Sequence, residues 1–353
     1  MRRGTGIRLL AAAVAARAGY AALGARPPGG AYRWTRTNHR GEPVTLLEGP
    51  AVALAGTAAA LVTPGLSGRD RAALAVAAAG SGAFGGYDDL AGGGDQRGFR
   101  GHLGALAHGQ VTTGAVKLAG IGVTGMIAAA LRDSDPAGPS RRAADLAIDS
   151  VLIASAANLM NLFDLRPGRA IKVTMLVGAG LAAAGPDARA VLAAPAGAAI
   201  AMLPEDLAER AMLGDCGANA LGAMLGVAAA SAPRRTRLAA LTVILALTAA
   251  SEKISFTKVI ERTPPLRWLD MLGRRPVTGP ASGPAGTPAG AGRPSGERDP
   301  ELIGEPGTVG EPETAGEHEP VGEPGTAGEH EPVGEPGLVS EPGTASASGS
   351  AGE

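Results

Sequence analysis

The sequence predicts an all-α, polytopic membrane bundle of about nine transmembrane helices, followed by a disordered C-terminal tail. Apolar segments separated by short charged loops fill the first 275 of the 353 residues. Within these segments polar residues gather at the ends instead of recurring every third or fourth position, so the amphipathic pattern of soluble helices is missing. Beyond these segments the chain becomes acidic and rich in Pro and Gly.

Nine apolar segments are the expected helices: Ile7–Leu23, Pro50–Val62, Ala72–Phe84, Val111–Leu131, Ala143–Phe163, Ala170–Ala184, Ala188–Leu203, Leu213–Ala230 and Leu238–Ala250. Several are shorter than the ~20 residues that cross hydrocarbon. Their many Ala and Gly residues are typical of helix packing in membranes, although a soluble protein with buried Ala-rich helices is the alternative. The first segment resembles a signal peptide, but Arg17 within it and the odd number of crossings favour a retained helix.

Three parts follow from the composition: a transmembrane domain (1–250), a basic interfacial segment (251–275) and a disordered acidic tail (276–353). The tail holds 14 acidic and 2 basic residues and an exact 12-residue repeat, Thr314–Gly325 and Thr326–Gly337. It has too few large apolar residues to offset the entropy of ordering. In the interfacial segment basic and apolar residues alternate, which predicts a helix that lies on an anionic membrane leaflet. A cytosolic segment that binds no membrane is the alternative.

Polar clusters interrupt the apolar pattern at five places, and each follows an odd-numbered segment. The clusters are Thr37–Pro43, Gly86–Leu90 together with Gly98–His102, Asn158–Arg169, Gly214–Asn219 and Ser251–Lys253. Because successive crossings alternate in direction, nine crossings place all five on one membrane face. Outside the segments, and up to residue 275, this face carries 15 Lys and Arg and the other carries 10, which favours a cytoplasmic position for the motif loops and the tail.

These clusters combine groups that suit phosphate chemistry. Carboxylates at a membrane boundary need a partner or a cation, and hard oxygen ligands suit Mg²⁺, which also takes substrate phosphates. Asn158, Asn161 and Asp164 are three apart, so they line one side of a helix end. The basic residues expected to bind phosphate oxygens are Arg40, Arg100, Arg166, Arg169 and Lys253. The pattern therefore predicts phosphoryl transfer at a lipid boundary.

Each cluster also has a purely structural interpretation. Asp88 and Asp89 suit a helix cap or a solvated turn, Asn158 and Asn161 suit hydrogen bonds between helices, and Gly214–Gly217 suits a turn. The single Cys216 excludes a disulfide scaffold and, without a partner, a zinc site. The net charge of −1 gives no reason to expect nucleic acid.

In their order along the chain the motifs resemble the polyprenyl-phosphate N-acetylhexosamine-1-phosphate transferase superfamily (glycosyltransferase family 4), which includes the phospho-N-acetylmuramoyl-pentapeptide transferases. Asp88-Asp89 matches the aspartate pair of this family, Asn158–Asp164 its N-x-x-N-x-x-D motif, and Gly214–Gly217 its G-D-x-G motif. The resemblance extends from about Arg36 to Lys253. Several departures mark a divergent member: Leu165 follows the third motif in place of Gly, Gly92 stands where the family has a lysine, the loop Pro43–Gly49 departs from the family's Pro-Thr-x-Gly-Gly, and the family's His-rich loop and tenth span are absent.

The resemblance implies a Mg²⁺-dependent membrane enzyme of the bacterial plasma membrane. Such an enzyme transfers a sugar 1-phosphate from a UDP-sugar to a polyprenyl phosphate, releasing UMP, at the start of a cell-envelope glycan pathway. By motif match Asp215 binds Mg²⁺, and Asp88 and Asp89 act on the lipid phosphate as base or through the metal. Asn158, Asn161 and Asp164 line the nucleotide-sugar site.

Two alternative functions stay open. A catalytically inactive relative that binds lipid-linked intermediates or scaffolds envelope enzymes fits the altered motifs. A transporter would need charged or broken helices at mid-membrane, and Arg17, Lys117 and Asp149 are the few charges inside the segments. The sequence also leaves open a homodimer.

Overall fold

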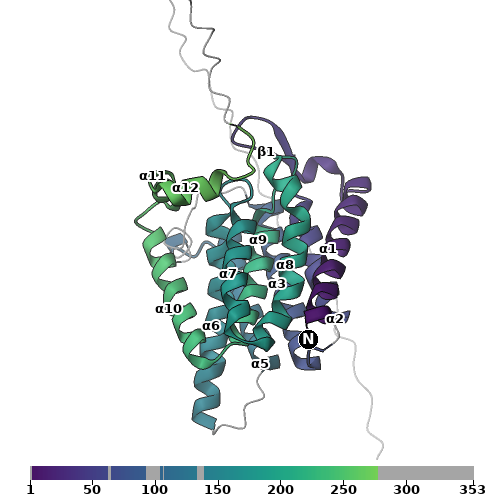
Figure 1. Cartoon of the computed structure of the whole chain (residues 1–353). Coiled ribbons are helices and arrows are strands. Elements are labelled where there is room, and N and C mark those ends of the chain that lie inside the picture. The colour runs from purple at the N-terminus through teal and green to yellow at the C-terminus, as the bar shows by residue number, and fades with distance from the viewer. Residues whose placement is uncertain (1, 63–64, 93–103, 106, 133–138, 277–353) are drawn as a thin grey trace, which may run out of the picture. The chain divides into compact units, whose positions relative to one another are not determined.

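The computed structural model describes residues 2–62, 65–92, 104–105, 107–132 and 139–276, and these contain eleven α-helices and one small sheet (Figure 1). The helices are α1 (Arg2–Ala25), α2 (Glu48–Val62), α3 (Gly68–Ala91), α5 (Thr113–Arg132), α6 (Pro139–Phe163), α7 (Arg169–Ala184), α8 (Pro186–Leu207), α9 (Gly214–Ala230), α10 (Arg234–Ser251), α11 (Phe256–Arg262) and α12 (Pro264–Met271). Each of the nine apolar segments forms one helix, α1 to α10. The helical fold class is therefore confirmed for this part of the chain.

A β-hairpin is the one departure from an all-α fold among the described residues. The strands β1 (Thr35–Thr37) and β2 (Pro43–Thr45) pair antiparallel, with Thr35 opposite Thr45. The side-chain oxygen of Asn38 accepts the backbone N–H groups of Arg40 and Glu42, and Gly41 adopts the left-handed conformation (φ 81°) that the tight turn requires. The sequence analysis had taken this stretch as a polar loop.

The core is built around α9, which is buried along nearly its whole length and packs mainly against α3 and α6. Small residues allow this close approach. A Cβ at Gly226 would lie 2.6 Å from the Cα of Ile153 on α6, and one at Gly222 would lie 2.7 Å from the Cα of Ala157. Since lipid gives helices no hydrophobic reason to associate, such tight backbone contact is the attraction that membrane bundles rely on.

Four helices are long and apolar enough to cross a membrane: α1, α5, α6 and α8. The bent pair of α10 and α11 makes a fifth if it counts as one span. The helices α2, α7 and α9 have only 15 to 17 residues, about 22 to 26 Å at 1.5 Å per residue, which is shorter than the hydrocarbon core of ~30 Å. The apolar helices indicate a membrane-embedded protein, and nine crossings stay a prediction.

The chain turns by 97° between α10 and α11, after which α11 and α12 lie across one end of the bundle (Figure 1). This stretch is the predicted interfacial segment. The guanidinium of Arg169, at the start of α7, fastens it through paired contacts with Asp270 at 2.7 and 3.2 Å. The rings of Phe163 and Phe256 stack at 5.1 Å between centroids. From residue 277 onward the predicted disordered tail lies outside the described residues.

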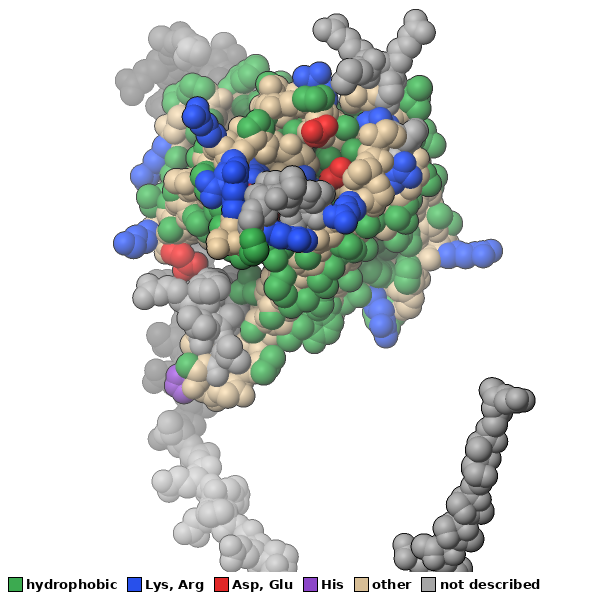
Figure 2. All heavy atoms as spheres, turned by 90° about the horizontal axis from the view of Figure 1, so that it is seen from below, with side chains coloured by type: hydrophobic (Ala, Val, Ile, Leu, Met, Phe, Trp, Pro, Cys, Tyr) green, Lys and Arg blue, Asp and Glu red, His purple; other side chains and the backbone are tan. Residues whose placement is uncertain are grey.

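The opposite end of the bundle holds a network of ion pairs. Figure 2 shows this end, where Lys and Arg side chains outnumber acidic ones. Arg132 of α5 contacts Asp149 of α6 at 3.6 Å, and Arg237 of α10 contacts Asp149 at 3.0 Å and Asp145 at 3.4 Å. The charges therefore join α5, α6 and α10 at the end far from the polar motifs.

Candidate functional site

The polar motifs predicted to share one face meet at one end of the bundle. The hairpin reaches the segment before α9, because Thr45 donates to the carbonyl of Arg210 and accepts from the N–H of Met212 at 2.9 Å. The end of α3 reaches the first turn of α9 through Asp89. Motifs far apart in the sequence are therefore neighbours in space.

The centre of this end is a lysine held between two carboxylates. The Nζ atom of Lys117, on α5, lies 2.7 Å from Oδ2 of Asp88 and 2.5 Å from Oδ2 of Asp215. The three side chains are only 11 to 25% exposed. Sequence reasoning noted Lys117 as an isolated charge in an apolar segment but gave it no place in the site. Because a charge within a membrane span needs a partner, its position in the segment was the signal that could have identified it.

Asp89 has a different environment from Asp88, although the two are adjacent. Its two carboxylate oxygens accept the backbone N–H groups of Asp215 at 3.0 Å and Cys216 at 2.9 Å. These are among the unpaired donors of the first turn of α9, where the helix dipole also favours negative charge. Asp89 therefore holds Asp215 in position, and each of its oxygens already accepts one N–H group.

The donor set suits Mg²⁺. Mg²⁺ is usually held by one or two carboxylates and completes its shell with water and substrate phosphates, and Asp88 and Asp215 are two carboxylates that converge on one cation. Among the described residues no group of three or more His, Cys, Asp or Glu side chains is arranged to hold a metal ion. The pair thus fits as a partial site, with the ammonium of Lys117 at the cation position.

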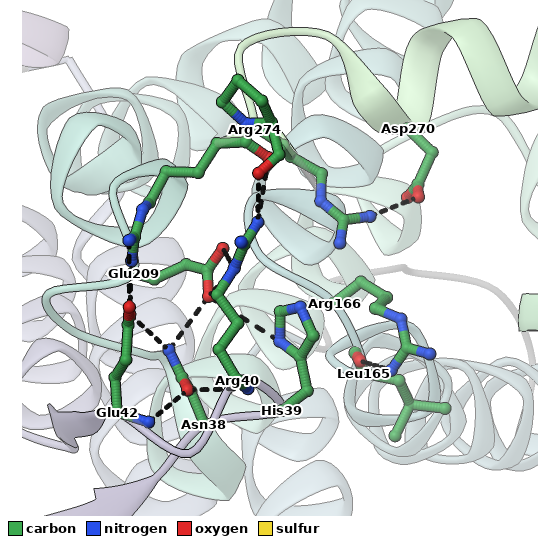
Figure 3. Close-up of polar contacts among 11 residues, drawn as sticks. Asn38, His39, Arg40, Glu42, Leu165, Arg166, Glu209, Asp270 and Arg274 are labelled. Carbon is green, nitrogen blue, oxygen red and sulfur yellow. Dashed lines mark hydrogen bonds and ion pairs between the residues drawn. The ribbon is translucent and has the colours of Figure 1, made fainter. Parts of the chain in front are cut away.

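Beside this cluster lies a polar pocket of about 160 Å³. It is lined by the hairpin, the loop after α6, the end of α8 and the segment before α9, including His39, Asp164, Arg166, Asp206 and Glu209. Figure 3 shows His39 between the Arg40–Glu209 pair and Arg166. Among the described residues, the guanidinium of Arg166 hydrogen-bonds only to the carbonyl of Leu165, so most of its donors have no hydrogen-bond partner there.

Glu209 organises the wall of the pocket. It is the one residue other than glycine with positive φ in the described chain (57°), a conformation that costs free energy and persists where the surroundings fix it. Its buried carboxylate accepts from Asn38 at 2.9 Å and from Nε of Arg40 at 2.9 Å. Arg40 also donates to the carbonyls of Arg275 and Pro276, so its charge is committed to protein partners.

Among the titratable groups that line the pocket, His39 and Asp164 are both shifted from their ordinary pKa values. Burial lowers the pKa of His39 below 6.5, and the positive charges of Arg166 and Arg40 lower it further against the opposing effect of Glu209. Burial raises the pKa of Asp164 well above its usual range, and the charges of Asp206 and Asp215 add to this. At neutral pH His39 is therefore neutral, with one donor and one acceptor nitrogen.

The remaining predicted site residues differ from one another in burial and in hydrogen bonding. Asn158 and Asn161 lie in the last two turns of α6, and neither side chain hydrogen-bonds to a described residue. Arg169 is 3% exposed and gives its donors to Asp270 and Thr257. Lys253 is exposed just after α10, with no side-chain partner among the described residues.

Two further polar residues at this end were given no role by the sequence analysis. Glu48, the first residue of α2, and Asn219, one turn beyond Asp215, are fully buried without a side-chain hydrogen-bond partner in the described chain. For Glu48 its position immediately before an apolar segment was the available signal.

A second, apolar pocket of about 420 Å³ lies between α6, α7, α9 and α10. Its lining is apolar except for Thr236 and includes Phe163, Val243 and Leu247. Phe163 directly precedes Asp164, so the apolar pocket extends to the polar end of the bundle.

No protein-family model and no curated protein matches this chain.

Proposed function

We propose that this protein transfers a sugar 1-phosphate from a UDP-sugar to a polyprenyl phosphate, with release of UMP, at the surface of a bacterial plasma membrane. One observation carries the proposal. The carboxylates of Asp88, Asp89 and Asp215 come from two helices to one end of an apolar bundle, beside a cation, a polar pocket and an apolar pocket.

The polar pocket is the place we assign to the nucleotide sugar. Arg166 has donors free for a pyrophosphate, and a guanidinium forms paired hydrogen bonds with phosphate oxygens. Neutral His39 offers one donor and one acceptor to a base or sugar. Asn158 and Asn161 have unused amide groups on the helix that leads to Asp164. We leave Arg169 and Arg40 out of direct binding, because Asp270 and Glu209 already hold them.

The apolar pocket is the place we assign to the first part of the polyprenyl chain. It lies between α6, α7, α9 and α10, and its wall reaches Phe163 at the polar end. A chain bound there brings its phosphate towards Lys117, whose ammonium provides a positive charge for the phosphate oxygens.

The reaction joins an oxygen of the polyprenyl phosphate to the phosphorus that carries the sugar, and the bond from that phosphorus to the oxygen of UMP breaks. Both reactants are anions, so the barrier contains a large electrostatic term. Lys117 and Arg166 offset this charge from two sides. Asp89 fixes the first turn of α9, which keeps Asp215 oriented. Mg²⁺, when bound by Asp215 and Asp88, supplies further charge neutralisation for the phosphates.

In this proposal the chain crosses the membrane nine times, with the motif loops in the cytoplasm where UDP-sugars occur. The product is a lipid-linked sugar at the start of a cell-envelope glycan pathway.

The test is release of UMP from a panel of UDP-sugars by the full-length protein in membranes supplied with polyprenyl phosphate, with labelled sugar counted in the lipid fraction. We expect Asp215→Asn to lower turnover by at least about 100-fold, as loss of a transition-state charge partner does. The matched control is Asp187→Asn, an exposed residue in the first turn of α8, which should leave turnover unchanged.

Equal turnover in the wild type and the Asp215→Asn variant would contradict the assignment. Binding of polyprenyl phosphate without UMP release from any donor would instead favour the inactive, lipid-binding relative.

A further inference from the structure

We propose that Lys117 is an internal counter-ion that competes with the divalent cation for Asp88 and Asp215, so that the metal binds tightly only after Lys117 has moved onto a phosphate. This inference rests on the proposed function for the identity of the metal site. It adds the condition under which Asp88 and Asp215 can bind a divalent ion.

The contacts of Lys117 show that its ammonium occupies the position a metal ion would take. Its Nζ atom lies within 2.7 Å of both carboxylates, which leaves no room for a second cation between the same oxygens. Its side chain is 11% exposed, so water screens these contacts poorly. A divalent ion entering between Asp88 and Asp215 must therefore displace the ammonium or bear strong repulsion from it.

The flanking groups make displacement the simpler outcome. Asp89 is the poorer alternative ligand, because each of its carboxylate oxygens already accepts an N–H group from α9. Lysine, in contrast, has a flexible four-carbon stem and three donors. Lys117 can therefore turn away from the carboxylates without movement of α5, provided that another anion receives it.

A substrate phosphate is the anion that the site is built to receive. When a phosphate accepts Lys117, the carboxylate pair loses its counter-ion and its affinity for a divalent cation rises. By thermodynamic linkage the metal raises phosphate affinity by the same factor. The exchange thus sets the order of binding. Without phosphate, the ammonium of Lys117 stays between the two carboxylates and the affinity for a divalent ion is low.

The test measures metal binding without turnover. Mn²⁺, a spectroscopic substitute for Mg²⁺, is titrated into the purified full-length protein, and free Mn²⁺ is followed by electron paramagnetic resonance. Lys117→Gln removes the charge and nearly keeps the length of the side chain. We expect it to bind Mn²⁺ at least 10-fold more tightly than the wild type. Lys258→Gln, at an exposed position on α11, is the control and should match the wild type.

A short-chain prenyl phosphate provides the second measurement. It should tighten Mn²⁺ binding by the wild type several-fold more than by the Lys117→Gln variant, in which there is no ammonium to draw away. Thermal unfolding of each variant confirms that it is folded.

The outcomes separate the two proposals. Equal or weaker Mn²⁺ binding by the folded Lys117→Gln protein would overturn the exchange. Absence of Mn²⁺ binding in every variant would overturn the metal site and the exchange with it. Tighter binding by Lys117→Gln in a protein that releases no UMP would support the exchange and count against the transferase.

Discussion

Asp88 and Asp89 are neighbours in the sequence, yet their carboxylates have different tasks. Asp89 accepts two backbone N–H groups of α9, whereas Asp88 faces Lys117. We expect Asp89→Ala to lower the free energy of unfolding by about 1–3 kcal/mol, because it leaves two shielded donors without an acceptor. Thermal unfolding of the protein in detergent measures this.

The matched variant for this prediction is Asp88→Ala. Lys117 keeps Asp215 as a partner there, so the loss of stability should be clearly smaller. Equal destabilisation by the two substitutions would contradict the division of tasks.

At His39 a pH dependence follows from the lowered pKa. Between that value and the ordinary pKa of 6.5 the unfolded chain binds more protons than the folded one, so stability rises with pH across this window. It levels off once the unfolded imidazole is also neutral. Unfolding measured from pH 5 to pH 8 should show this rise in the wild type. A profile of unchanged steepness in His39→Gln would assign the rise to other groups.

The residues of the site could be predicted only in part. The acidic and amide motifs were identified from their order and spacing, and the structure places Asp88, Asp89 and Asp215 together. The partners of the basic residues could not be predicted in the same way. Arg40 pairs with Glu209 and Arg169 with Asp270, and 169 and 101 residues separate these pairs in the chain. Local pattern cannot identify such long-range partners.

Among the elements, the contact between α6 and α9 depends on two glycines. A Cβ at Gly222 or Gly226 would fall within 3 Å of the α6 backbone. We expect Gly222→Ala or Gly226→Ala to destabilise the protein by about 1–3 kcal/mol, as overpacking does. Gly180→Ala is the control, because a Cβ there meets nothing within 4 Å. That change should be neutral or stabilising by about 0.5–1 kcal/mol.

Apparent melting temperatures of the three variants give the comparison. If Gly222→Ala proves as stable as Gly180→Ala, close backbone contact does not hold α6 against α9.

The α11–α12 segment depends on the ion pair of Arg169 with Asp270. Removal of one partner leaves a buried charge uncompensated, which typically costs about 3–5 kcal/mol, so Asp270→Asn should release this segment. Burial raises the pKa of Asp270, but Arg169 and Arg274 outweigh it and hold the pKa below 3.8. The contribution of the pair is therefore complete above pH 3.8 and is lost as the pH falls through the lowered pKa.

Proteolysis within residues 251–275 measures this release. Faster cleavage is expected for Asp270→Asn than for Glu261→Gln, an exposed change on α11. Equal cleavage rates would show that other contacts, such as the Phe163–Phe256 stack, are sufficient.

The helices could be predicted from the sequence because each apolar run is bounded by charges, Gly or Pro. Their ends were less accurate, since polar residues such as Gly68–Arg71 extend α3 beyond its apolar run. The hairpin was missed because its strands have three residues each, too few for an alternating pattern to be visible. It forms through contacts with the distant segment before α9.

For the whole molecule, the polar site lies at one end of the bundle and the Arg-rich ion-pair network at the other. Arg237 and Arg234 fasten the start of α10 to α6 through Asp145. At the other end of α10 the chain turns into α11 and α12, which Asp270 fastens to α7. α10 is thus held at both ends while its middle lines the apolar pocket. This arrangement leaves the pocket wall the least constrained part of the helix.

The same arrangement predicts where the membrane surface lies. Trp268 on α12 is 68% exposed, and the exposed Lys258, Arg262 and Arg267 are near it in the sequence. Exposed apolar and basic side chains on a helix that lies across the bundle end are typical of contact with an anionic leaflet. The chain has two tryptophans, so Trp34→Phe leaves Trp268 as a single fluorescent reporter.

In nanodiscs that contain anionic lipid, brominated acyl chains should quench Trp268, and aqueous acrylamide should quench it weakly. Replacement of Lys258, Arg262 and Arg267 by Gln should reduce the lipid quenching, because each basic residue near an anionic surface contributes about 1 kcal/mol. Raised salt should have the same effect, since it screens exposed charges. If acrylamide quenches Trp268 fluorescence and brominated lipid does not, α12 lies in water. The membrane boundary then lies on the α10 side of the α10–α11 turn.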